Sequence, residues 1–121
     1  MDQAEFTKRF NAVNGPDLTA DDWYKIRDDS FKTDGAIEKI GIAQEECAEL
    51  IQALSKQHRY QTYRMSVLEE IADVRISLEY VRMAMGFTHA DIIKAIDIKL
   101  ERERLRLEEL KDTNKWEDKT C

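Results

Sequence analysis

Proline and glycine are scarce in this sequence: there is one proline and there are four glycines among 121 residues. Because these two residues are the strongest local breakers of helices and strands, the chain has few places to turn, which favours long helices. No segment alternates apolar and polar residues with the period of two that a half-buried strand requires. The sequence therefore predicts an all-α protein.

Long apolar runs and paired cysteines are also missing. No apolar run approaches the roughly 18 residues that mark a membrane-spanning helix, and residues 1–5 lack the basic-then-apolar order of a signal peptide. The two cysteines, Cys47 and Cys121, lie far apart and form no C-x-x-C motif. We therefore expect a protein of the reducing cytoplasm with no membrane partner.

Basic residues are outnumbered: 19 lysines and arginines stand against 25 aspartates and glutamates, which gives a net charge of -6. A protein that binds a nucleic acid polymer needs a basic face for the phosphates, so the composition argues against that class. An acidic protein that binds a polyphosphate must bring cations with it. Hydrophobic residues make up 42% of the chain, which excludes a disordered protein.

Helix start and stop signals predict four main helices. In chain order, the expected helices cover about residues 19–31, 37–56, 65–85 and 88–110. A polar connector at residues 58–63 joins the two central helices, and because it is short these helices are expected to lie antiparallel in a helical bundle. The length predicts one domain over residues 1–121, with N-terminal helices of unclear role in residues 1–35 and a frayed tail at residues 112–121.

Both central helices direct carboxylates toward their apolar faces. At about 100° per residue, Leu50 and its apolar neighbours fall within about 80° of Glu46, so Glu46 points into the apolar arc. Glu49 lies about 60° away, at the edge of the same arc. On the next helix Glu70 lies in the middle of an apolar stripe, and Asp73 is again about 60° away. Each helix therefore carries an acidic pair, three residues apart, on a packing surface.

Four unpaired carboxylates on packing surfaces would cost more free energy than one small domain has available. Few basic residues share these faces, so divalent cations are the simplest neutralising partner. An all-oxygen ligand set suits Mg²⁺ first and Mn²⁺ second, and it lacks the His or Cys that favours zinc. Acidic pairs at this spacing are also common on exposed helix faces, and in that alternative the four carboxylates contact water.

The two acidic pairs also form a longer motif. Residues 45–49 read EECAE, and after 20 residues the chain continues with EIAD at residues 70–73. Over about residues 36–107 this E-E-x-x-E–x20–E-x-x-D pattern resembles the MazG-like, all-α nucleoside triphosphate pyrophosphohydrolases, relatives of the dimeric dUTPases. The resemblance implies hydrolysis of a nucleoside triphosphate to the monophosphate and pyrophosphate, with Mg²⁺ held by Glu46, Glu49, Glu70 and Asp73.

In that reaction water attacks the α-phosphorus. Glu46 is the residue expected to position or deprotonate this water, because it lies deepest in the apolar arc, where its pKa is most open to change. Glu45 and Glu49 are the alternatives for the base, and the sequence does not decide among the three.

Basic residues are the candidates for substrate binding. The resemblance implies phosphate contacts from Lys99 and later basic residues of the last helix, and Arg102 lies in the same stretch. Lys56 borders the central hairpin and is a candidate for the pyrophosphate end of the substrate. Arg106 is a secondary candidate, because an ordinary ion pair with a glutamate of its own helix fits it equally well.

The helix over residues 65–85 is apolar on two sides, so one protomer has too little surface to cover it and a homodimer is expected. Members of the resembled family form dimers or tetramers made of two dimers. Two other functions stay open: a non-enzymatic helical interaction protein, and a metal-binding homologue that has drifted to another substrate. A di-iron carboxylate bundle is disfavoured, because the sequence lacks the E-x-x-H pairs which that class needs.

Overall fold

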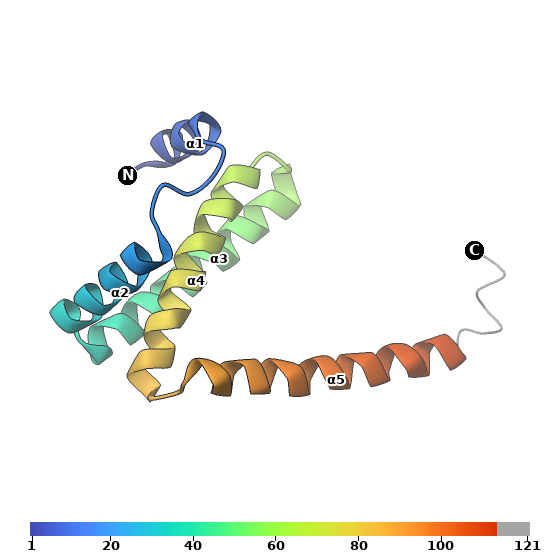
Figure 1. Ribbon diagram of the computed structural model, residues 1–121. Helices are drawn as coiled ribbons and strands as arrows, with labels where there is room; N and C mark the ends of the chain where they lie inside the picture. The colour runs from blue at the N-terminus through green and yellow to red at the C-terminus, as the bar shows by residue number, and fades with distance from the viewer. Residues whose placement is uncertain (114–121) are drawn as a thin grey trace. The chain divides into compact units, whose positions relative to one another are not determined.

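The computed structural model describes residues 1–113, whose regular structure is entirely helical, and this confirms the all-α prediction. These residues form five helices, which are labelled in Figure 1. In chain order they are α1 (Gln3–Ala12), α2 (Ala20–Asp34), α3 (Ala36–Tyr60), α4 (Arg64–Met85) and α5 (His89–Thr113). Over the same residues, no helix combines the length and the apolar character that a membrane span requires.

Contacts divide the chain into two units. The first, Met1–Gly86, contains α1 to α4, and the second begins at Phe87 and contains α5. The single domain predicted over residues 1–121 stays a prediction. Of the frayed tail predicted at residues 112–121, the first two residues belong to α5, and residues 114–121 lie outside the described part of the chain.

Two predicted helix starts are confirmed by reciprocal capping bonds. At α2 the backbone N–H of Asp22 donates to Thr19 Oγ1 (3.1 Å), and the N–H of Thr19 donates to the Asp22 carboxylate (2.9 Å). At α5, Asp91 and Thr88 make the same two bonds, at 3.1 and 2.8 Å. Each pair satisfies N–H groups that the first turn of a helix leaves without a partner.

The connector between the central helices is shorter than the sequence predicts. Because α3 continues to Tyr60, only residues 61–63 separate it from α4. Gln57 holds this turn from both sides: its C=O accepts the N–H of Gln61 (2.8 Å), and its Oε1 accepts the N–H of Tyr63 (2.7 Å). Gln61 ends α3 in the left-handed conformation, with φ of 59°.

α3 and α4 lie side by side along their length and, with so short a connector, run antiparallel (Figure 1). The buried apolar side chains between them are mostly small: Ala43 and Ala53 on α3, and Val74 on α4. Among the described residues no large side chain is fully buried. The thin core leaves room for polar groups along the contact between the two helices, and these groups define the candidate site.

Lys39 joins three helices of the first unit. Its side chain is 6% exposed, and its Nζ lies 2.8 Å from the Asp34 carboxylate and 2.7 Å from the Ser30 hydroxyl, both on α2. The same Nζ lies 4.2 Å from the centroid of the Tyr80 ring on α4. A buried ammonium is tolerated only with such partners, so Lys39 holds the end of α2 against α3 and α4.

Replacing Lys39 with methionine is expected to lower the free energy of unfolding by about 2–3 kcal/mol, because Ser30 and Asp34 lose their shared partner while the volume of the side chain is kept. Lys32→Met, at an exposed position of α2, is the control and should change it by less than about 0.5 kcal/mol. Urea unfolding measures both. Equal effects of the two substitutions would contradict the proposed role of Lys39.

Candidate metal centre

Three glutamates from two helices bring their carboxylates together between α3 and α4. One carboxylate oxygen from each of Glu46, Glu49 and Glu70 lies within 4.8 Å of the other two. Glu46 and Glu49 are about one turn apart on α3, and Glu70 comes from α4. The antiparallel packing of α3 and α4 therefore brings Glu70 to two acids that lie more than 20 residues before it in the sequence.

Two oxygens of this group are buried and have no partner. Oε2 of Glu46 and Oε2 of Glu70 accept no hydrogen bond from any described residue, whereas the side chain of Glu49 is exposed. A buried carboxylate oxygen without a partner is costly, so such a group either takes up a proton or binds a cation. Because every available ligand atom is a carboxylate oxygen, the residues fit a hard divalent cation such as Mg²⁺ or Mn²⁺.

Burial and mutual repulsion raise the pKa values of the cluster. Burial raises the pKa of Glu46 to about 7, and the negative charges of Asp73, Glu49 and Glu70 add to the rise. Burial, followed by the charge of Glu49, also raises the pKa of Glu70. Both causes favour the neutral carboxylic acid, so the cluster retains protons toward neutral pH unless a cation displaces them.

Asp73, the fourth predicted ligand, lies beside this group on α4. Its negative charge raises the pKa of Glu46. Burial raises the pKa of Asp73 itself. Asp73 is not one of the three residues whose oxygens all lie within 4.8 Å of one another. Its part as a metal ligand therefore stays a prediction.

The remaining predicted site residues lie outside the cluster. Glu45 is exposed on α3, next to Glu46 in the sequence but outside the converging group. Lys56 is also exposed on α3, with its Nζ 5.8 Å from the centroid of the Tyr63 ring. No contact of either residue points to a substrate site, so the parts assigned to them stay predictions.

The basic candidates of the last helix belong to the second unit. Lys99, Arg102 and Arg106 are all exposed on α5. Arg106 forms an ion pair with Glu103 of the same helix, which is the ordinary pairing that the sequence leaves open for it. The predicted contacts of Lys99 and Arg102 with phosphate stay predictions.

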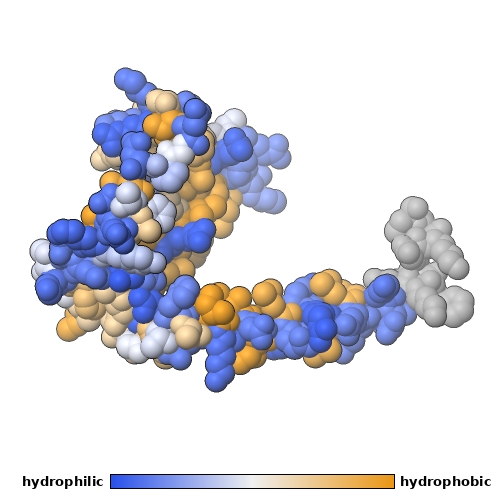
Figure 2. All heavy atoms as spheres, in the orientation of Figure 1, coloured by the Kyte–Doolittle hydropathy of each residue, from blue (hydrophilic) through white to orange (hydrophobic). Residues whose placement is uncertain are grey.

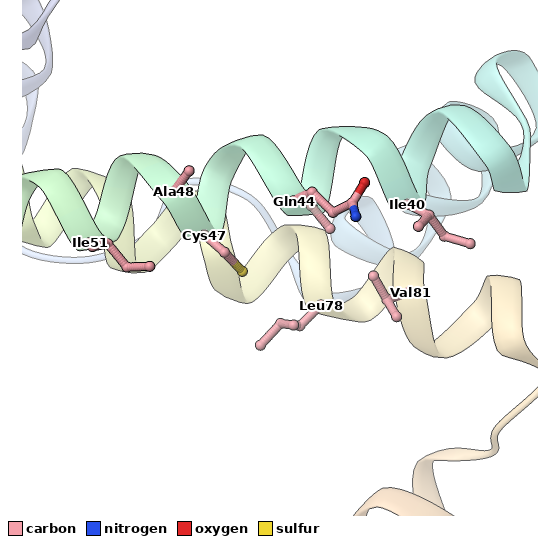
Figure 3. A pocket seen from close by; sticks show the side chains of 8 residues that line it. Ile40, Gln44, Cys47, Ala48, Ile51, Leu78 and Val81 are labelled. Carbon is pink, nitrogen blue, oxygen red and sulfur yellow. The ribbon is translucent and has the colours of Figure 1, made fainter.

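An apolar groove runs along the hairpin, and the sequence pattern alone does not identify it. It is lined by residues of both helices, as Figure 3 shows: Ile40, Ala43, Gln44, Cys47, Ala48, Ile51, Leu78 and Val81. Ile51 and Leu78 are 65% and 52% exposed. None of the four acids lines this groove, and around α3 Cys47 lies about 100° to one side of Glu46 while Glu49 lies about 60° to the other.

Comparisons of the chain with models of protein families, with curated proteins and with solved structures find no match. The resemblance to the MazG-like pyrophosphohydrolases, which depends on the two acidic motifs, therefore stays a prediction.

Proposed function

We propose that this protein is a Mg²⁺-dependent nucleoside triphosphate pyrophosphohydrolase of the MazG-like kind, which forms a monophosphate and pyrophosphate. One observation carries the proposal: Glu46 and Glu70 each leave a buried carboxylate oxygen without a partner, within a group of three converging acids. A helical interaction protein with solvated acidic faces has no need of such atoms, because every exposed carboxylate is satisfied by water.

Glu46, Glu49 and Glu70 would hold the metal ions, with Asp73 beside them. Bound Mg²⁺ supplies the positive charge that neutralises carboxylates and phosphate oxygens and makes nearby water more acidic. This explains how a chain with a net charge of -6 accepts a triphosphate. The exposed side of the group, formed by Glu49, faces the solvent from which the nucleotide arrives.

Glu46 would be the general base. Its unpartnered Oε2 takes a proton from a water molecule, the water oxygen bonds to the α-phosphorus, and the bond from that phosphorus to the leaving pyrophosphate oxygen breaks. In the metal-free protein the raised pKa of Glu46 makes its carboxylate a stronger base than an ordinary glutamate. Lys99, Arg102 and Lys56 would contact the phosphates, with Arg106 as a further candidate.

A second copy of the chain would cover the apolar groove of α3 and α4. Large half-exposed side chains such as Ile51 and Leu78 are costly to leave in water and typical of an interface between subunits. A homodimer formed in this way would leave the carboxylates uncovered, because none of them lines the groove. A tetramer requires one further interface.

Incubation with Mg²⁺ and a panel of ribonucleoside and deoxyribonucleoside triphosphates tests the activity. We expect pyrophosphate and monophosphate as products, with no free phosphate, and a loss of at least about 100-fold in rate for Glu70→Gln, which removes one ligand charge. Exposed Glu38→Gln is the matched control on the first unit. If no nucleotide is cleaved but Mg²⁺ still raises the melting temperature, the chain is the drifted metal-binding homologue. If Mg²⁺ also has no effect, the interaction protein is favoured.

A further inference from the structure

Helix α5 carries an apolar stripe that no described residue of its own unit buries. None of its residues is buried, and Ile93, Leu100 and Leu107 are 52%, 62% and 53% exposed. Figure 2 shows apolar side chains recurring along α5. An amphipathic helix gains its stability by packing such a stripe against another element, and no described residue of the second unit provides one.

The spacing of the stripe is typical of a two-stranded coiled coil. Its positions alternate in steps of three and four residues, and only one of them is not Ile or Leu: Ile93, Ile96, Leu100, Glu103, Leu107 and Leu110. A repeat of this period keeps one helix face against a partner helix over several turns. The 25 residues of α5 extend over about 37 Å, which is long enough for three repeats.

The charges of α5 disfavour a parallel pair with a second copy. In a parallel pair, Glu103 would lie opposite the partner's Glu103 inside the interface. At the edges, Lys99 would face the partner's Arg104, and Arg106 would face the partner's Lys111. All of these contacts join like charges, which act against association.

We propose that α5 pairs antiparallel with the α5 of a second copy of this chain. The pair is centred between residues 101 and 102, so that position 100 meets position 103 of the partner. From the ends to the centre, the contacts are Ile93 with the partner's Leu110, Ile96 with the partner's Leu107, and Leu100 with the partner's Glu103, each formed twice by the two-fold symmetry.

The antiparallel order creates attractive pairs at the edges of the interface. Asp97 lies opposite the partner's Arg104, and Glu103 lies next to the partner's Lys99. Arg104 already has an ion pair within its own helix, but five N–H donors allow a guanidinium to serve both acids. Lys99 opposite the partner's Arg106 is the one like-charge contact, and Glu103 neutralises Arg106 within each helix. This charge complementarity favours a second copy as the occupant over an unrelated apolar surface.

Leu105 and Leu107 offer a matched test of the interface. They are 50% and 53% exposed, so glutamate at either position removes little contact within the chain, but only Leu107 belongs to the stripe. Leu107→Glu is expected to weaken the association step that α5 mediates at least about 100-fold in sedimentation equilibrium, and Leu105→Glu by less than about threefold. Equal effects of the two, or a wild-type chain that stays a single 14.2 kDa species at micromolar concentration, would overturn the pairing.

A charge swap tests the antiparallel order. Asp97→Arg and Arg104→Asp each replace two attractive pairs by repulsive ones, so each should weaken association about tenfold. The double substitution exchanges the two charges, so the pairs are attractive again, and the affinity should return to within about threefold of the wild type. In a parallel pair these two residues do not face each other. A double variant as weak as the single ones, with its helix intact by circular dichroism, would therefore overturn the antiparallel order.

Discussion

Replacing Glu46 with glutamine is expected to lower the rate of pyrophosphate formation by about 100- to 10,000-fold at saturating Mg²⁺ and nucleotide. Glutamine keeps the size of the side chain and can still fill the site between α3 and α4, but its amide cannot accept a proton from water at neutral pH. The loss should therefore appear in kcat rather than in KM. Coupled detection of pyrophosphate measures the rate, and calorimetry measures Mg²⁺ binding by the same variant.

Glu45→Gln is the matched control, since it makes the same chemical change at the adjacent residue. Glu45 is exposed and outside the converging group, so its replacement should change kcat by less than about threefold. A Glu46→Gln variant that binds Mg²⁺ and turns over at the wild-type rate would show that Glu46 is not the base. A large loss at Glu45 instead would move the base to the exposed side of α3.

Helical periodicity is sufficient to place Glu46 and Glu70 on packing surfaces before any coordinates are known. Both lie within long helices that no proline interrupts, so errors in angle do not accumulate at a break. The convergence of these residues depends on the register between α3 and α4, which only three connecting residues constrain. The connector predicted from the sequence is longer than the observed one, because no local sequence signal marks the left-handed conformation of Gln61 that ends α3.

The burial of Lys39 is a feature that helical periodicity does not predict. It lies two turns before Glu46 on the same face of α3, where a sequence pattern would place an apolar residue. Its burial depends on Ser30 and Asp34, which return beside α3 only because the chain reverses at Gly35 with φ of 86°. The groove along α3 and α4 is likewise a property of packing, since it forms only where residues of the two helices meet.

Proton binding by the carboxylate cluster is expected to make the metal-free protein less stable as the pH rises from about 5 to about 8. The pKa of Glu46 is raised from 4.5 to about 7 in the folded chain, and the pKa values of Glu70 and Asp73 are raised too. Between the unfolded and the folded pKa, the folded state binds more protons than the unfolded state, so the free energy of unfolding falls with increasing pH. For Glu46 alone the loss is at most about 3 kcal/mol, because its side chain keeps some contact with solvent.

Mg²⁺ should reverse this loss, because the cation replaces the protons that the cluster gives up. In thermal unfolding with EDTA, we expect the melting temperature to fall by roughly 10 °C between about pH 5 and about pH 8. Millimolar Mg²⁺ should restore most of the lost melting temperature at about pH 8 and have little effect at about pH 5. Acids with lowered pKa values, such as Glu79, titrate below this range and do not mask the effect. Glu46→Gln should reduce the dependence of the melting temperature on pH, and Glu45→Gln should leave it unchanged. A metal-free protein that becomes more stable toward pH 8 would contradict the prediction, because the buried oxygens of Glu46 and Glu70 would then not destabilise the fold when they are ionised.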